Sequence, residues 1–243
     1  KKGFIMNHDI TIEVLTEFST AFSSNPVNRI AMNAVTSAGL LAASKNPMAQ
    51  RESRHSYSIS LEQGEITNQK QSGRCWMFAA LNTFRFEVMK NLNLKTFELS
   101  QNYTLFYDKL EKSNYFLESI LETLDEPTQG RLISFLLSAP LGDGGQWDML
   151  CNLVRKYGVV PKEAMPETVS SSATREMTSA LTRKLREDAC RLRKAYADGS
   201  TLDELRQKKE AMMEEIYRVL CICLGEPPKT FDLEVTDKDD KFI

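Results

Sequence analysis

Apolar residues recur at steps of three and four along most of this chain of 243 residues, which is the spacing of helices with one buried face. The first predicted helix carries four such residues: Val14, Leu15, Phe18 and Phe22. Asp9 or Thr11 can cap this helix, and the sequence that ends in Pro26 stops it. A second helix, rich in Ala and Ser, is predicted over residues 28–43.

The central helix is predicted to begin at or just before Cys75. From there, one face carries a run of apolar side chains: Met77, Ala80, Leu81, Phe84 and Val88. Ser72 is the predicted cap of this helix, and Gly73 allows the tight turn that leads into it. Further helices are predicted near residues 101–110, 114–124 and 131–137.

A helical hairpin is predicted in the charged region from residue 173 to residue 224. Its first helix carries the apolar stripe Met177, Leu181, Leu185, Ala189, Leu192 and Tyr196. Its second helix carries Leu205, Met212, Ile216 and Leu220. Asp198, Gly199 and Ser200 separate the two helices. The last residues, 231–243, are predicted to form a strand and a charged turn that enters another strand.

Charge and composition narrow the function classes. The chain has 31 basic and 33 acidic residues, a formal net charge of −2 and 42% hydrophobic residues, which suits one or two folded domains. This balance gives no support for binding to nucleic acid or to an anionic membrane. Basic residues cluster on the first hairpin helix, but neighbouring acids offset them and favour an ion-paired surface. No apolar run approaches the length of a bilayer span, and the predicted location is the reducing cytoplasm.

The cysteines form an odd number at irregular spacing: Cys75, Cys151, Cys190, Cys221 and Cys223. This pattern argues against a disulfide framework. Cys221 and Cys223 lack the further ligands that structural zinc needs, so they are predicted to be buried helix residues. Neither a metal nor an organic cofactor is expected.

Cys75 is the residue with the clearest candidate chemistry. At the start of a helix, free backbone N–H groups and the positive end of the helix dipole favour a thiolate, which can attack a carbonyl group. The backbone N–H of Cys75 and the side-chain amide of Gln69, six residues upstream, can hold the oxyanion that forms. The alternative is a packed cysteine that begins a core helix, since free cysteine is often buried.

The segment from Gln69 to Trp76 resembles the active-site motif of papain-like cysteine peptidases. It departs from their signature, Cys-Gly-[Ser/Ala]-Cys-[Trp/Tyr], because Ser72 replaces the first cysteine and Arg74 replaces the small residue. In that form the segment is similar to the bleomycin hydrolase and aminopeptidase C branch. The resemblance implies that Cys75 is the nucleophile and that Gln69 belongs to the oxyanion hole.

A second match lies in residues 141–150. In papain-like enzymes a pair of glycines here forms a wall along which the substrate backbone lies, because glycine has no Cβ. The resemblance assigns this wall to Gly144 and Gly145, and it adds Asp143 and Trp76 to the predicted substrate-binding residues. Taken alone, the glycines would indicate an ordinary turn.

The resemblance implies an α+β papain-like fold, of which this chain covers the mainly helical part. It divides the chain into an N-terminal helical arm (1–53), a helical left domain with the nucleophile (54–166), an inserted helical hairpin (167–228) and the start of the β-rich right domain (229–243). Within the left domain, Ser100 resembles the serine that caps the helix after the central one. In this branch the hairpin helps six subunits to form a ring, so a homohexamer is expected, and some relatives bind DNA.

A cysteine nucleophile of this type needs a histidine, oriented by an asparagine, as its base and acid. The chain has only His8 and His55, and both precede Cys75, whereas the family places its pair far downstream. His55 is predicted to be structural, and His8 is predicted to face solvent. The favoured expectation is that this chain is the N-terminal portion of a longer enzyme. The alternative is a natural truncated protein that no longer catalyses.

The predicted function is a cysteine aminopeptidase that removes N-terminal residues from peptides through a thioacyl intermediate. The alternative is a catalytically inactive helical assembly or binding protein that retains the peptidase half-fold.

Overall fold

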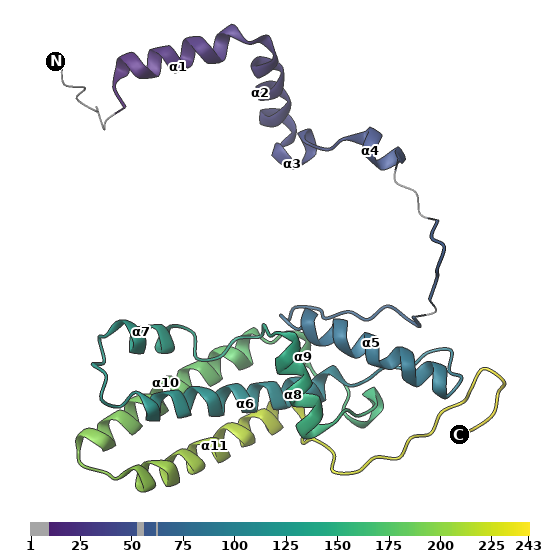
Figure 1. Ribbon diagram of the computed structural model, residues 1–243, viewed down its shortest axis with the longest axis vertical. Coiled ribbons are helices and arrows are strands. Elements are labelled where there is room, and N and C mark those ends of the chain that lie inside the picture. Colours follow the sequence, from purple (N-terminus) through teal and green to yellow (C-terminus); the bar gives the residue numbers. More distant parts are fainter. Residues whose placement is uncertain (1–9, 53–55, 62) are drawn as a thin grey trace. The chain divides into compact units, whose positions relative to one another are not determined.

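The computed structural model describes residues 10–52, 56–61 and 63–243 (Figure 1). Contacts divide the chain into two compact units, residues 1–60 and residues 61–243. The finer division predicted from the sequence, with boundaries after residues 53, 166 and 228, stays a prediction.

The described part of the first unit is helical: α1 (Ile12–Ser24), α2 (Pro26–Ala38), α3 (Leu40–Ala43) and α4 (Pro47–Glu52). Thr11 caps α1, because its hydroxyl accepts a hydrogen bond from the Val14 N–H at 3.4 Å. This confirms one of the two predicted caps, and Asp9 lies outside the described residues. The second predicted helix is wrong as a single element, because Gly39, with a φ of +81°, ends α2. Helices α1, α2 and α3 bury no side chain.

The second unit is also helical in its described residues. Its elements are α5 (Cys75–Asn91), α6 (Gln101–Glu122), α7 (Arg131–Ser138), α8 (Trp147–Tyr157), a short 3₁₀ helix (Lys162–Ala164), α9 (Val169–Ser172), α10 (Arg175–Ala197) and α11 (Leu202–Leu224). The two segments predicted over residues 101–124 are wrong as separate helices, since α6 is unbroken. Ser100 caps α6 as predicted, because its hydroxyl accepts a hydrogen bond from the Tyr103 N–H at 3.0 Å.

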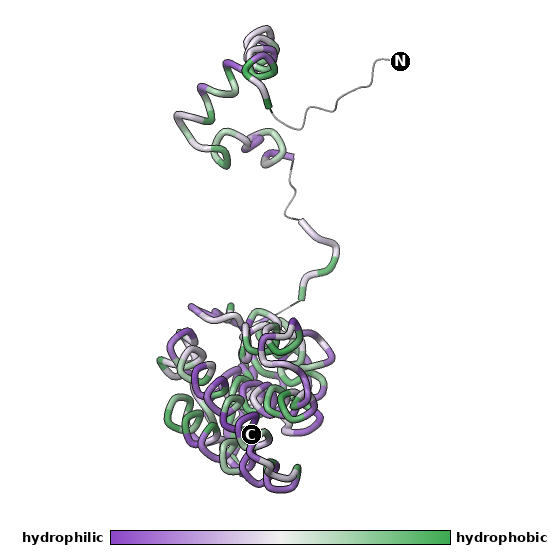
Figure 2. The backbone as a smooth tube through the Cα atoms, turned by 90° about the vertical axis from the view of Figure 1, so that its left-hand side faces the viewer, coloured by the Kyte–Doolittle hydropathy of each residue, from purple (hydrophilic) through white to green (hydrophobic). Residues whose placement is uncertain are grey.

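Helices α6, α10 and α11 lie side by side and share one hydrophobic core (Figure 1). The buried residues of the two hairpin helices include nine of the predicted ones: Met177, Leu181, Leu185, Ala189, Leu192, Leu205, Met212, Ile216 and Leu220. Tyr196 was predicted to join them but is 36% exposed, because its hydroxyl reaches out to the Asp125 carboxylate at 2.6 Å. Figure 2 shows hydrophobic and hydrophilic residues interleaved along the helices of the chain. Burial of each large aliphatic side chain contributes about 1.5–3 kcal/mol, which holds the hairpin against α6.

Helix α5 begins at Cys75, as predicted, and packs against α6 and α8. Two of its residues, Leu81 and Met89, join a smaller cluster of buried side chains with Leu94, Phe97 and Leu99 from the segment that follows. Phe84 and Val88, predicted to be buried, are half-buried. The burial of one face of α5 anchors its first turn, which carries Cys75.

The cap predicted for α5 is wrong. Arg74 occupies the N-cap position and makes no side-chain capping hydrogen bond. The Ser72 hydroxyl instead donates to the carbonyl oxygen of Gln69 at 2.6 Å and accepts from Nε of Arg74 at 2.8 Å. The first N–H groups of α5 are therefore left without a side-chain cap.

Residues 225–243 form no regular strand. Val235 and Ile243 exchange two backbone hydrogen bonds, of 3.1 and 2.9 Å, beside an isolated bridge between Thr236 and Phe242. The predicted pair of strands is therefore present only as an irregular hairpin. The mainly helical character of the covered chain is confirmed, and none of its described helices is long and apolar enough to cross a membrane.

Candidate active site

Cys75 is the first residue of α5, and its side chain is exposed and carries a free thiol. The alternative of a packed cysteine is therefore wrong at this position. The N-terminus of α5 favours negative charge on nearby groups, because its uncapped N–H groups carry partial positive charge. Among the other free cysteines, Cys190 is exposed on α10, whereas Cys221 and Cys223, predicted to be buried, are half-buried on α11.

The nucleophile turn, which we define as residues 69–74, folds back on itself. The Ser72 hydroxyl donates to the carbonyl oxygen of Gln69, and the Gln71 N–H donates to the carbonyl oxygen of Ser172 at 2.9 Å. The side chain of Gln69 is half-buried, and its Oε1 atom is buried without a hydrogen-bond partner in the described part of the chain. The chain reversal suits an oxyanion role for Gln69, and the role itself stays a prediction.

Asp143 joins the nucleophile turn to helices α5, α6 and α10. Its carboxylate accepts hydrogen bonds from the Gly73 N–H at 3.1 Å, the Thr174 hydroxyl at 2.5 Å and the Lys109 ammonium group at 2.5 Å. Its backbone oxygen accepts one from the Trp76 indole N–H at 2.9 Å. The structure thus brings two predicted site residues, Asp143 and Trp76, into contact. Because the protein's own donors occupy the carboxylate, substrate binding by Asp143 stays a prediction.

Burial works to raise the pKa of Asp143, but the charge and hydrogen bond of Lys109, with those of Thr174 and Gly73, outweigh burial and lower the pKa from 3.8 to about 2. A carboxylate with a depressed pKa in the folded state stabilises the fold above its unfolded pKa, and this contribution is lost as the pH falls through the folded value.

We therefore expect the stabilisation by Asp143 to be complete above about pH 4 and to disappear between pH 4 and pH 2. After allowance for solvent screening, it amounts to about 1–2 kcal/mol. Urea unfolding of the wild-type chain and the Asp143→Asn variant, followed from pH 7 to pH 3, measures this. The stability gap between them should narrow in acid, and a gap that does not change with pH would contradict the assignment.

The two glycines predicted to form the substrate wall differ in their surroundings. A Cβ atom on Gly145 would lie 2.5 Å from the Trp76 ring, so a side chain there would displace the indole. A Cβ atom on Gly144 would meet nothing within 4 Å, so there is open space beside this glycine. The carbonyl oxygen of Gly144 accepts a hydrogen bond from Nζ of Lys112 at 2.7 Å. The glycine segment, residues 142–145, therefore packs on Trp76 and is held by α6.

Arg74, next to Cys75, is fully buried, with 0% of its side chain exposed. Its guanidinium group donates to both carboxylate oxygens of Glu167, at 2.9 and 2.8 Å, and lies 5.1 Å from the centre of the Phe78 ring. The sequence pattern gives Arg74 no role beyond a departure from the family signature. Its partner lies 93 residues away, so spacing alone carries no signal of this pair.

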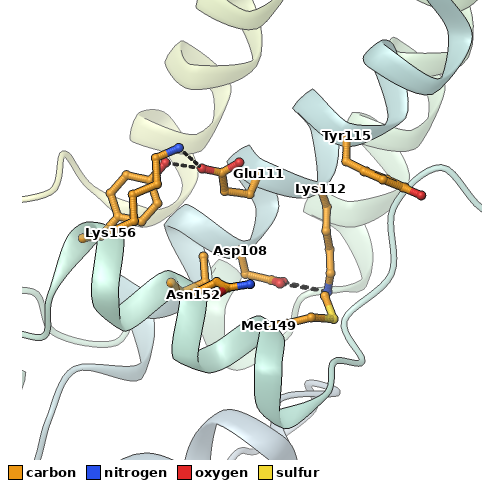
Figure 3. Close-up of a pocket in the computed structure, with 9 residues that line it drawn as sticks. Asp108, Glu111, Lys112, Tyr115, Met149, Asn152 and Lys156 are labelled. Carbon is orange, nitrogen blue, oxygen red and sulfur yellow. Dashed lines mark hydrogen bonds and ion pairs between the residues drawn. The ribbon is translucent and has the colours of Figure 1, made fainter. Parts of the chain in front are cut away.

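An open hollow of about 660 Å³ adjoins the nucleophile turn. Its lining includes Lys70, Ser72, Gly73, Asp143, Thr174 and Thr178. A second cavity, of about 540 Å³, lies between α6 and α8 (Figure 3). In that cavity Lys112 pairs with Asp108 at 2.9 Å and Lys156 pairs with Glu111 at 2.5 Å. Cys75 lines neither of these two cavities, but the first borders the nucleophile turn that precedes Cys75.

Comparisons with known proteins decide the family. The model of the peptidase C1-like family matches residues 9–243. The chain belongs to the peptidase C1-like family. Aminopeptidase C of Listeria monocytogenes is 48% identical over 237 residues, which cover 98% of this chain and 53% of that protein. Bleomycin hydrolase of Homo sapiens is 45% identical over 224 residues, which cover 90% of this chain and 49% of that protein.

Among solved structures, the crystal structure of PepW from Lactobacillus rhamnosis HN001 matches this peptidase C1-like chain with a TM-score of 0.94 at 46% identity. The match covers 98% of this chain and 53% of that one. The chain thus spans about half the length of the relatives that it matches. These findings confirm the predicted resemblance to the bleomycin hydrolase and aminopeptidase C branch.

Both histidines of this peptidase C1-like chain, His8 and His55, lie outside the described residues. The described residues therefore contain no imidazole that could serve Cys75 as a base. They also contain no group of three or more His, Cys, Asp or Glu residues that could hold a metal ion.

The basic residues of α10 are used in part within the protein. Lys184 pairs with Asp188 at 2.6 Å, and Arg191 pairs with Glu187 at 2.5 Å. These pairs agree with the ion-paired surface predicted for this helix. Binding to nucleic acid stays an implication of the resemblance.

Proposed function

We propose that this chain carries the nucleophile of a cysteine aminopeptidase that removes N-terminal residues from peptides. The observation that carries the proposal is the exposed free thiol of Cys75 at the start of α5, directly after a turn that contains Gln69. Relatives that are 40–48% identical bear the names aminopeptidase C and bleomycin hydrolase, which supports the same assignment.

In the proposed reaction, the Cys75 sulfur attacks the carbonyl carbon of the first peptide bond. The carbonyl oxygen becomes an oxyanion, for which the backbone N–H of Cys75 and the side-chain amide of Gln69 are the proposed donors. The C–N bond then breaks, and the amine leaves with a proton, which leaves the N-terminal residue as a thioester. Water hydrolyses the thioester and restores the thiol. The resemblance assigns the proton transfers to a histidine, which an asparagine orients, and it places both residues downstream of this chain's described residues.

The glycine segment and the hollow beside the nucleophile turn support the binding of a peptide. The backbone of Gly144 has open space beside it, so an extended substrate can come within hydrogen-bonding distance of the main chain. The hollow of about 660 Å³ next to Gly73 offers room for a substrate side chain. Its open shape suits a broad range of substrate side chains.

A matched pair of substrates tests this proposal in the complete protein. Alanine linked to aminomethylcoumarin has a free α-amine, whereas its N-acetyl derivative does not. We expect release of the fluorophore from the first compound and none from the second. Equal cleavage of both would show that no free α-amine is needed, which indicates an endopeptidase or a general amidase instead. No cleavage of either, or of any short peptide, would favour the inactive binding protein.

Gln69→Ala is expected to lower kcat by about 10²–10³, since one oxyanion donor is lost. KM should change much less, because the oxyanion exists only in the transition state. Gln63→Ala is a matched control, because Gln63 is exposed and lies outside both the nucleophile turn and the lining of the hollow. Equal activity of the two variants would remove Gln69 from the mechanism.

A further inference from the structure

Lys109 is a buried charge whose position calls for a physical explanation. Its side chain is 0% exposed, and it lies on the same face of α6 as the apolar core residues Leu105 and Phe116. A buried ammonium group is costly unless other groups pair with it. Nζ of Lys109 donates to the Asp143 carboxylate at 2.5 Å and to the carbonyl oxygen of Gly142 at 2.7 Å. Both acceptors belong to the glycine segment.

A second lysine of α6 holds the same segment. Lys112, three residues after Lys109, donates to the carbonyl oxygens of Gly142 at 3.1 Å and Gly144 at 2.7 Å. It also pairs with Asp108, as Figure 3 shows, and the side chain of Asp108 is 1% exposed. Asp108 lies 3.8 Å from Nζ of Lys109 as well. The two lysines and the two aspartates, Asp108 and Asp143, therefore form a cluster without net charge.

Asp143 connects this cluster to both sides of the nucleophile. Its carboxylate binds the N–H of Gly73, two residues before Cys75, and its backbone oxygen binds the indole of Trp76, the residue after Cys75. Through Thr174 it also binds the start of α10. A shift of Asp143 would therefore move the main chain before Cys75 and the side chain after it.

We propose that Lys109 and Asp143 are positioning residues, which hold the glycine segment and the nucleophile turn in the geometry that the reaction needs. The inference rests on the proposed function. Neither residue touches a reacting atom in this scheme, and each acts through Gly73, Trp76 or the glycine backbone. A buried ion pair is a weak source of stability compared with apolar packing, so a geometric role accounts better for its use here. Reacting groups must lie within a fraction of an ångström of the productive arrangement, which a rigid clamp supplies.

The test is the turnover of Lys109→Met and Asp143→Asn in the complete protein, measured with the free-amine coumarin substrate. Each kcat is divided by the number of active sites titrated with an irreversible thiol-specific epoxide, so partly unfolded protein does not count. We expect kcat per titrated site to fall about 100-fold, the usual effect of a displacement of about 1 Å, while KM changes little. In the Asp143→Asn variant, the amide oxygen of the new asparagine can still accept the hydrogen bond from Lys109. Its NH₂ group then faces the Gly73 N–H, and because both are donors, the hydrogen bond to the nucleophile turn is lost.

Lys184→Met is the matched control, because Lys184 is a mostly buried lysine that pairs with Asp188 and Glu215 between α10 and α11, away from the nucleophile turn. It should lose stability and keep kcat per titrated site. If Lys109→Met does not fold, the kcat values per titrated site of Asp143→Asn and Thr174→Val test the positioning role. Thr174→Val is the milder change, since it removes only one donor to Asp143. A fall of less than about tenfold in kcat per titrated site for Asp143→Asn overturns the positioning role. A wild-type protein that cleaves neither coumarin substrate instead overturns the proposed function.

Discussion

Replacement of Cys75 by alanine is expected to abolish peptide hydrolysis and to leave the fold intact. The side chain is exposed at the first position of α5, so its loss creates no cavity in the core. Without the sulfur, no thioester can form. Removal of the nucleophile from a comparable catalytic group in a serine protease lowers kcat by on the order of 10⁶, and we expect a loss of that size here. Turnover of the free-amine coumarin substrate and circular dichroism measure the two parts of this prediction.

Cys190→Ala is the control for the Cys75 variant. Cys190 is the other exposed free cysteine among the described residues, and it lies on the hairpin helix α10. Its replacement should leave turnover unchanged and should leave Cys75 as reactive as before toward a thiol-specific reagent. Residual hydrolysis in the Cys75 variant at the wild-type rate would assign the nucleophile to another group.

Arg74→Met is expected to destabilise the fold by about 3 kcal/mol, at the lower end of the range for one partner lost from a buried ion pair. The variant leaves the Glu167 carboxylate without its bidentate partner and leaves the Ser72 hydroxyl without the Nε donor. Because the Glu167 side chain is 23% exposed, water can solvate part of its unpaired charge, so we expect a loss at the lower end of this range. The midpoint of urea unfolding, at constant slope, measures the loss.

An exposed ion pair provides the comparison for Arg74. Arg191 and Glu187 on α10 are 58% and 53% exposed, so Arg191→Met should cost less than about 1 kcal/mol. The stability loss of Arg74→Lys should lie between those of Arg74→Met and Arg191→Met, because lysine keeps the charge but cannot bind both carboxylate oxygens at once. If Arg74→Met is no more destabilising than Arg191→Met, the buried pair does not hold the nucleophile turn.

Helical periodicity predicted the elements that apolar burial decides. The hairpin helices were predicted correctly, because residues such as Leu181, Leu185 and Ile216 repeat at helical steps and are buried against α6. The break predicted within α6 was wrong, because polar residues in its middle are compatible with the helix. There the Ser113 hydroxyl is buried and donates to the carbonyl oxygen of Lys109 at 2.7 Å.

Contacts between distant residues account for most of what the sequence did not predict at the candidate site. Ser72 has the right type and position for a cap, but its hydroxyl is used by Gln69 and Arg74. The partner of Arg74 and the partners of Lys109 lie on other segments, which a local pattern cannot identify. The one available signal was a lysine on the apolar face of a helix, since lysine is rarely buried without a partner.

The contact between Gly145 and the Trp76 ring couples the evolutionary histories of two positions. Any residue larger than glycine at position 145 needs a smaller or displaced side chain at position 76, because the space is already filled. Displacement of the indole would also break its hydrogen bond to the backbone of Asp143. Either change alone should therefore be selected against, and descendants of this chain are expected to retain both residues or to exchange both together.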